Sequence, residues 1–169
     1  LHVKFVASAN ILEGFSGWII RTLVDPIPRK KDSSADDTVN LIIKNLKAGI
    51  NVGMFPEGNK SWDGETCFIS KRTASLLKEA ECGLVTYRVE GVYLKSPRWS
   101  DRERRGPLFG HLIREYSAEE LKQMSVDDIY EIICRDLYIN AFEEQRIRMD
   151  KYSAKGLSTF HFIFLIFVI

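Results

Sequence analysis

Short apolar runs alternate with amphipathic segments along this chain, and this alternation limits the folds that it can adopt. The runs VKFVA, NVGMF and GLVTYRV, at residues 3–7, 51–55 and 83–89, have the length and composition of strands. Strands that alternate with helices predict an α/β fold, with a mixed, mostly parallel sheet flanked by helices. Because the first run begins at Val3 and Leu1 is not Met, we expect the domain to be truncated at its N-terminus.

Four helices are predicted from capping residues and apolar spacing. They cover residues 34–48 and 70–81, a short stretch after Ser117, and a long stretch from Ser125 to about Met149. Each of Ser34, Ser117 and Ser125 precedes an acidic residue by three positions, as in a capping box, and Gly49 ends the first helix. The residues expected to face the core are Val39, Ile42, Ile43 and Leu46, then Ala74, Leu77 and Ala80, and finally Ile129, Ile132, Ile133 and Leu137.

Composition argues against several classes of function. The chain has 169 residues, of which 45% are hydrophobic and 28% charged, which suits one ordinary domain with a core. A formal net charge of +1 gives no sign of nucleic-acid binding. Cys67, Cys82 and Cys134 are widely spaced, form no C-x-x-C pair and have no His at zinc-ligand spacing. We therefore expect reduced thiols and no metal site.

The segment LKSPRWSDRERRGPLFG, residues 94–110, has two prolines, five basic residues and two acidic residues around a tryptophan. A tryptophan among arginines is common where proteins contact membranes, so one hypothesis is that this segment lies against a membrane surface. The residues that would attract anionic lipid are Arg98, Trp99, Arg102, Arg104 and Arg105. The alternative is a solvated connection in which the charges keep the loop soluble. His111, just beyond, is expected to be a structural histidine with a hydrogen-bond partner.

The tail at residues 160–169, FHFIFLIFVI, is a continuous apolar run with one histidine. A helical bilayer span takes about 20 residues, so this run is too short to cross a membrane. A buried strand, an interfacial segment, the cut end of a longer segment and a shifted reading frame are all compatible with it. We therefore assign residues 1–150 to one domain and residues 151–169 to a separate apolar tail.

The stretch NVGMFPEGNKSWDG, residues 51–64, is similar at first sight to a phosphate-binding P-loop. Gly53 and Gly58 have the required spacing, but Asn59 stands where the lysine must be and Lys60 follows one position late. The segment FPEGNKS still suits a phosphate that carries free hydroxyls, because Glu57 offers an acceptor and Lys60 a cation beside a flexible glycine. The alternative is a surface turn in which Glu57 and Lys60 form a weak ion pair.

Open α/β sheets bind their ligands beyond the carboxyl ends of strands. We therefore expect the strands that end near Ala7, Phe55 and Val89 to lie side by side, with Glu57 at the carboxyl end of one of them.

FPEGNKS resembles the Phe-Pro-Glu-Gly-Thr/Asn-Arg-Ser block of glycerophospholipid acyltransferases of the 1-acylglycerol-3-phosphate acyltransferase type. FVASANI resembles the strand and turn that precede the family's second block, and DPIPRK resembles the Ile-x-Arg ending of that block. LVTYRVEGVYLKSPRW resembles the Val-Pro-Val block, and the order is the expected one over residues 3–150. The resemblance implies an O-acyltransferase that moves a fatty acyl group from a thioester donor, acyl-coenzyme A or acyl carrier protein, to lysophosphatidic acid. It also implies phospholipid biosynthesis at the cytoplasmic face of a membrane, with a peripheral or anchored protein and no cofactor.

The substrate-binding residues that the resemblance implies are Arg29, Phe55, Pro56, Glu57, Gly58, Asn59, Lys60 and Ser61. In the family, the equivalents of Arg29, Glu57 and Lys60 hold the acceptor's phosphate and glycerol, so we expect Arg29 and Lys60 to converge on one phosphate. The sequence departs from the family at Lys60, which replaces Arg, at Pro28, which replaces an acid, and at Thr86, which replaces the Pro of the last block. A lysine neutralises a phosphate without the bidentate geometry of arginine, so looser orientation is expected.

The family's catalytic block, His-x-x-x-x-Asp, is not found among the 169 residues. The residues five positions after the three histidines are Ala7, Tyr116 and Ile166. In the family this block precedes the first strand, so we expect it before Leu1 and expect the chain alone to be inactive. The alternative function is a non-catalytic module that binds anionic lipid or phosphate through the same residues. A degenerate nucleotide-binding loop is disfavoured by the position of Lys60.

Overall fold

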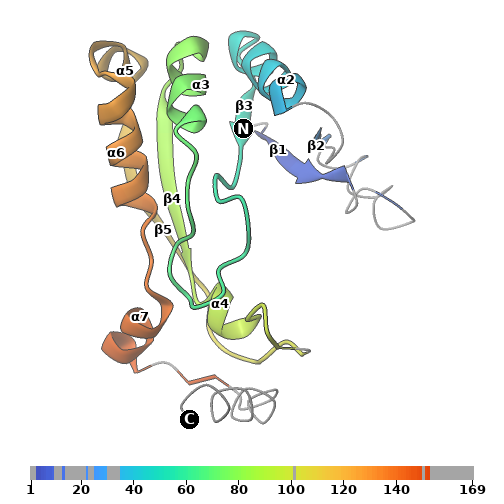
Figure 1. Cartoon of the computed structure of the whole chain (residues 1–169), viewed down its shortest axis with the longest axis vertical. Coiled ribbons are helices and arrows are strands. Elements are labelled where there is room, and N and C mark those ends of the chain that lie inside the picture. Colours follow the sequence, from blue (N-terminus) through green and yellow to red (C-terminus); the bar gives the residue numbers. More distant parts are fainter. Residues whose placement is uncertain are drawn as a thin grey trace, which may run out of the picture. The chain divides into compact units, whose positions relative to one another are not determined.

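The computed structural model describes residues 3–9, 13, 22, 25–29, 35–100, 102–149 and 151–152. The elements, labelled as in Figure 1, are β1 (Val3–Ser8), β2 (Ile27–Arg29), α2 (Ala35–Lys47), β3 (Asn51–Gly53), α3 (Arg72–Ala80), β4 (Leu84–Glu90), α4 (Val92–Lys95), β5 (Phe109–Tyr116), α5 (Ala118–Gln123), α6 (Val126–Leu137) and α7 (Ala141–Arg148). They confirm the predicted fold class, since the fold is mixed α/β with a parallel sheet flanked by helices. None of the helices in these ranges has both the length and the apolar character that crossing a bilayer requires.

The chain divides into two compact units, and each is described by itself. The first unit comprises Leu1–Pro56, Ser70–Leu84 and Tyr116–Tyr130, and the second comprises Glu57–Ile69, Val85–Glu115 and Glu131–Ile169. Residues 153–169 lie outside the described residues, so the separation of an apolar tail from a domain at 1–150 stays a prediction.

The first unit contains a three-stranded parallel sheet in the order β2-β1-β3. Residues 3–5 of β1 are in register with residues 51–53 of β3, and residues 6–8 with residues 27–29 of β2. Two of the predicted strands are therefore parallel neighbours, although β3 ends at Gly53 and not at Phe55. Pro56 lacks the backbone N–H needed to continue the ladder, so the strand does not run on through the FPEGNKS segment.

The core of the first unit forms where α2 packs on α3 and on the parallel sheet. Its buried side chains are Ile27, Ile42, Ile43, Leu76 and Ala80, with Val6, Val39, Leu46, Val52 and Cys82 packed against them. α2 and α3 confirm the helices predicted over residues 34–48 and 70–81. Gly49, with a φ of +75°, follows α2 in the left-handed conformation that commonly ends helices. Leu76 is buried in place of the predicted Leu77, because it shares the core-facing side of α3 with Ala80, four positions on. Ser34 lies outside the described residues.

The third predicted strand pairs differently from the prediction. β4 is hydrogen-bonded to β5 in a separate two-stranded sheet, and among the described residues that sheet shares no strand with the parallel one. The expected pairing of the strand ending near Val89 with the other two is therefore wrong. The sequence FGHLIREY of β5 was not predicted as a strand, because its charged and apolar residues do not alternate strictly.

The helices after β5 begin as predicted, but the long helix is broken. Ser117 and Glu120 form a reciprocal capping box at α5, and the Ser125 hydroxyl accepts from the Asp128 N–H at 3.1 Å before α6. α6 ends at Leu137, and Asn140 starts α7, with its side chain accepting from the Glu143 N–H at 3.1 Å. The prediction of one helix to Met149 is therefore wrong.

The inward positions of α6 are mostly as predicted. Ile129 and Ile133 are 0% and 2% exposed. Ile132 and Leu137 are only half-buried.

Candidate functional site

The FPEGNKS segment begins at Phe55, with one residue between it and the end of the parallel strand β3. Phe55, which is 77% exposed, and Pro56 belong to the first unit. Glu57–Ile69 belongs to the second unit, and we call it the motif loop. The two ends of the motif loop are joined by an antiparallel bridge between Glu57 and Ile69. Gly58 has no other atom within 4 Å of the position where a Cβ would stand, so its backbone is open to a ligand.

The carboxylate of Glu57 is half-buried and directed at the motif loop itself. Its Oε2 accepts a hydrogen bond from the Cys67 N–H at 2.8 Å. In the described part of the chain no ion pair joins Glu57 to Lys60, so the weak pair expected for a plain surface turn is not formed. Lys60 and Asn59 are exposed. Lys60 thus presents its ammonium to solvent while Glu57 supports the loop.

Hydrogen bonds within the motif loop also occupy Ser61 and Asp63. The Ser61 hydroxyl donates to Asp63 Oδ1 at 3.1 Å and accepts from the Gly64 N–H at 2.8 Å. Asp63 Oδ1 also accepts from the Glu65 N–H at 3.2 Å. The Glu65 N–H and the Ser61 hydroxyl hold the pKa of Asp63 below its ordinary value, because both stabilise the charged form. Ser61, predicted as a substrate ligand, therefore has a structural role in this loop.

Aromatic residues of α4 and the loop after it hold the motif loop from outside. The Tyr93 hydroxyl donates to the Trp62 carbonyl at 2.7 Å and accepts from Trp99 Nε1 at 2.9 Å. The guanidinium of Arg98 lies 5.8 Å from the centre of the Trp62 ring, and that of Arg104 lies 4.7 Å from the centre of the Trp99 ring. Sequence reasoning missed the roles of Tyr93 and Trp62, since their contact joins residues 31 positions apart.

Two expectations for residues 94–110 need correction. Trp99, expected on the surface, is half-buried. Arg104, expected to attract anionic lipid, is only 6% exposed, and its backbone N–H donates to the Lys95 carbonyl at 2.7 Å. This segment is thus an ordered support for the motif loop, and Arg98, Arg102 and Arg105 keep the exposure that the membrane hypothesis requires.

The segment between α6 and α7 forms hydrogen bonds with Glu65 and Thr66 of the motif loop. The Thr66 hydroxyl donates to the Leu137 carbonyl at 3.1 Å and accepts from the Ile139 N–H at 2.8 Å. Asn140 Nδ2 donates to Glu65 Oε1 at 3.0 Å. The break between α6 and α7 therefore supplies backbone groups that a continuous helix would use internally.

Arg29 is the last residue of β2 and is exposed at the carboxyl end of the parallel sheet. In the sheet register Arg29 is opposite Ser8 of β1. Gly53 of β3 is opposite Phe5 of β1, which precedes Ser8 by three residues. The segment that leaves β3 toward the motif loop thus starts from the same end of the sheet as Arg29. Arg29 and Lys60 belong to different units, so their convergence on one phosphate stays a prediction.

Thr86, which stands where the resembled family has proline, is a buried residue of β4 that contacts β5 and α6. It is 2% exposed, and its hydroxyl lies within hydrogen-bond distance of Asp136 Oδ2, at 3.0 Å, and of the Arg114 carbonyl, at 3.2 Å. Arg88 donates to the backbone carbonyl of Asp136 at 2.8 Å. The threonine that replaces the proline of the resembled family therefore makes side-chain contacts that a proline could not make.

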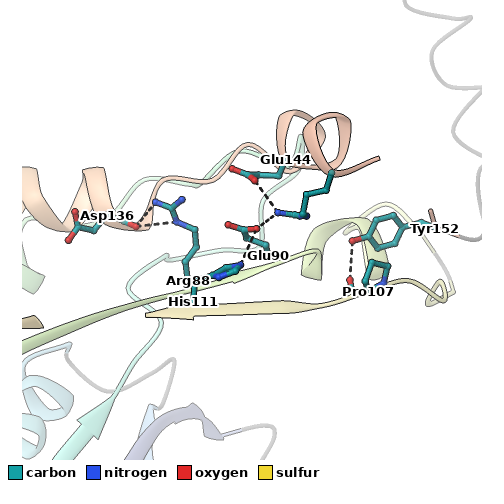
Figure 2. A network of polar contacts seen from close by, with 8 residues as sticks. Arg88, Glu90, Pro107, His111, Asp136, Glu144 and Tyr152 are labelled. Carbon is teal, nitrogen blue, oxygen red and sulfur yellow. Dashed lines mark hydrogen bonds and ion pairs between the residues drawn. The ribbon is translucent and has the colours of Figure 1, made fainter. Parts of the chain in front are cut away.

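A polar network links β4, β5 and α7 in the second unit (Figure 2). Glu90 is 6% exposed and pairs with Arg148, which also contacts Glu144 at 3.1 Å. His111 Nε2 lies 3.7 Å from Glu90 Oε2, and its side chain is 50% exposed. At this distance the two atoms do not form a hydrogen bond, so the hydrogen-bond partner expected of a structural histidine is not seen at Glu90, and the ring is not buried. Tyr152 donates to the Pro107 carbonyl at 3.0 Å beside this network.

The three cysteines are free. Within the described residues, no three His, Cys, Asp or Glu side chains gather closely enough to hold a metal ion.

The fold is thus that of an α/β protein in which the FPEGNKS segment follows a strand of a parallel sheet in the sequence. It is similar to the crystal structure of the 1-acyl-sn-glycerophosphate (LPA) acyltransferase PlsC from Thermotoga maritima, with a TM-score of 0.60 and 18% sequence identity. The alignment covers 79% of this chain and 55% of that protein, so the chain spans about half of its length. With a sequence identity of 18%, this similarity is evidence for the fold alone. No protein-family model and no curated protein matches the sequence.

Proposed function

We propose that this chain is the acceptor-binding part of a lysophospholipid acyltransferase, which transfers a fatty acyl group from a thioester donor to lysophosphatidic acid. The observation that carries the proposal is the FPEGNKS segment, which begins shortly after a parallel strand in a fold similar to that of PlsC. Such a position suits ligand binding in open α/β sheets.

The proposed site binds the acceptor through charge and through hydrogen bonds. Lys60, with its exposed ammonium, pairs with the phosphate. Arg29, which belongs to the other unit, stays the predicted second cation. Glu57 uses Oε2 for the Cys67 N–H, and within the described residues no donor contacts Oε1, which accepts from a glycerol hydroxyl. Open backbone at Gly58 allows the acceptor to approach closely.

The reaction needs a base that the 169 residues do not supply as a His-x-x-x-x-Asp block. The acceptor's free hydroxyl attacks the thioester carbonyl carbon, its proton passes to the base, and the carbon–sulfur bond breaks to release the thiol of coenzyme A or of acyl carrier protein. Since acceptor and product are both membrane lipids, we place the protein at the cytoplasmic face of a membrane, peripheral or anchored.

Binding of a short-chain lysophosphatidic acid below its micelle concentration, measured by calorimetry, tests the acceptor site. We expect Lys60→Gln and Glu57→Gln each to weaken binding about tenfold, since each removes a charged hydrogen-bonding group. Arg146→Gln on α7 is a matched control, because Arg146 is also exposed, and it should leave binding unchanged. A monoacylglycerol without phosphate should not bind measurably. Equal affinity for the two lipids, or no loss in Lys60→Gln, would contradict the proposed site.

The alternative, a non-catalytic module for anionic lipid or phosphate, uses the same side chains. Binding therefore does not separate the two functions, whereas acyl transfer to lysophosphatidic acid, measured as thiol release, does.

A further inference from the structure

The two faces of strand β4 have different surroundings. Thr86 and Glu90 are buried, whereas Val85, Tyr87 and Val89 are 60%, 54% and 37% exposed. Successive side chains of a strand point to opposite faces of the sheet. One face of β4 is therefore covered, and the other leaves large apolar side chains exposed to water.

The covered face packs against α6 and α7. Thr86 lies within hydrogen-bond distance of Asp136 on α6, at 3.0 Å, and Glu90 pairs with Arg148 on α7. The guanidinium of Arg148 also lies 4.7 Å from the centre of the Phe109 ring on β5. The odd-numbered positions at the start of β5 therefore share the covered face with the even-numbered positions of β4.

Leu112 of β5 lies on the exposed face. The Tyr87 hydroxyl is 2.1 Å from the position that a Cβ of Gly110 would occupy, so Gly110 shares the face of Tyr87. Leu112, two residues further on, shares this face as well, and it is 55% exposed. We call the surface formed by Val85, Tyr87, Val89 and Leu112 the open face. A contiguous apolar surface of this kind commonly marks a contact with another segment or molecule.

Tyr152 is the last residue that the structure describes, and it lies at one end of the β4–β5 sheet. Its hydroxyl donates to the carbonyl of Pro107, two residues before β5, at 3.0 Å (Figure 2). Its ring lies 2.0 Å from the position that a Cβ of Gly106 would occupy, and its hydroxyl lies 2.6 Å from that position at Gly91, which follows β4. The chain after Tyr152 therefore starts from the end of the sheet where β4 ends and β5 begins.

The chain after Tyr152 has the composition and the length to cover the open face. Residues 153–159, SAKGLST, are mostly small or polar, and residues 160–169, FHFIFLIFVI, are apolar apart from one histidine. At about 3.3 Å per residue, the seven-residue link can span about 23 Å and the ten-residue run about 33 Å, whereas the eight residues of β5 span about 26 Å. The apolar run is therefore long enough to extend along the whole open face.

We propose that residues 160–169 dock on the open face of the β4–β5 sheet in the same chain. An apolar run and an apolar sheet face each cost free energy in water, and packing one on the other removes both costs. The same chain is favoured over a second copy, because Tyr152 holds the start of the segment beside the sheet and so gives it a high effective concentration there. Residues 160–169 then belong to the folded domain and are not the separate tail that the sequence predicts. This inference does not depend on the proposed acyltransferase function.

Photo-cross-linking of the full chain tests the docking directly. A benzophenone side chain introduced at position 112 attaches to neighbouring C–H groups, and mass spectrometry of the digested product identifies the attached peptide. We expect attachment to residues 160–169 in a product that migrates as a monomer. The same group at position 147 is the control, because Ile147 is 73% exposed on α7 and α7 lies on the covered side, and it should not attach to these residues.

Cleavage of residues 160–169 by chymotrypsin, which cuts after phenylalanine, gives an independent measurement. We expect Leu112→Asp in the full chain to raise the rate of this cleavage at least about tenfold, because docking of the apolar run would bury a charge without a partner. Leu112→Met keeps an apolar side chain of similar volume and should retain the native rate. Ile147→Asp is the matched control and should also retain it. Circular dichroism checks that each variant is folded.

Three outcomes would overturn the proposal. A cross-link from position 112 to residues 160–169 of a second chain would assign the open face to a contact between copies. A cross-linked product without residues 160–169 would place a different segment on the open face. Equal cleavage rates in the native chain, Leu112→Asp and Ile147→Asp, with all three folded, would show that the open face does not protect residues 160–169.

Discussion

At the scale of single residues, Glu57 contributes both to the proposed site and to the local structure. Its Oε2 accepts the Cys67 N–H at 2.8 Å, which closes the motif loop beside the bridge between Glu57 and Ile69. A change at this position therefore alters loop order as well as ligand binding, and the two effects need separate measurements.

We expect Glu57→Ala to speed hydrogen exchange of the Cys67 amide about tenfold to a hundredfold, because a hydrogen bond to a charged group contributes about 1.5–3 kcal/mol. Glu57→Gln keeps an acceptor oxygen and should change exchange much less, although it removes the charge needed by the proposed acceptor site. Exchange that is equally slow in the native chain and in Glu57→Ala would show that the contact adds no stability.

Thr86 gives a second prediction at this scale. Thr86→Val removes the hydroxyl that lies 3.0 Å from Asp136 Oδ2 and leaves the 5% exposed Asp136 with one donor fewer. We expect the free energy of unfolding in urea to fall by about 1–3 kcal/mol. Thr73→Val on α3 is the control and should change it by less than about 0.5 kcal/mol. Equal effects at the two positions would refute the role given to the buried hydroxyl.

At the scale of elements, the break between α6 and α7 is the feature with the largest consequences for the site. Asn140 caps α7 by accepting from the Glu143 N–H, and its amide donates to Glu65. The Thr66 hydroxyl donates to the Leu137 carbonyl and accepts from the Ile139 N–H. A continuous helix over these residues would leave the motif loop without these partners.

Asn140→Ala should lower the free energy of unfolding by about 1 kcal/mol, the usual cost of losing an N-cap. Asn140→Ser keeps a capping oxygen and should recover most of this loss. We also expect faster amide exchange at Glu143 in the alanine variant but not in the serine variant. A change confined to other elements would mean that the cap is not what starts α7.

At the scale of the whole molecule, the fold is similar to about half of a larger acyltransferase. The described residues include the FPEGNKS segment and the side chains that support it. The 169 residues contain no His-x-x-x-x-Asp block. The proposed acceptor binding and the catalysis can therefore be tested separately.

We predict that the chain alone shows only background acyl transfer, since a general base contributes about 10²–10⁴-fold to the rate. Thiol release from acyl-coenzyme A and acyl carrier protein, with lysophosphatidic acid as acceptor, measures it. A form that includes native sequence before Leu1 should be active, and Glu57→Gln in that form should reduce the activity strongly. Full activity of the 169-residue chain would require another base, and His111 would then be tested. An inactive extended form that still binds lysophosphatidic acid would favour the non-catalytic module.

The sequence by itself determined the elements whose signals are local. Apolar runs located β1, β3 and β4, and the Ser117 and Ser125 boxes located the starts of α5 and α6. These signals depend on neighbouring residues only, so they can be read without knowing the fold. Only the tertiary structure decided that β4 pairs with β5, that Asn140 divides the last helix, and that Trp99 is covered while Trp62 is exposed. Each of these depends on partners distant in sequence, such as Tyr93 for Trp62 and Thr66 for Ile139, and a burial pattern within one segment does not reveal such partners.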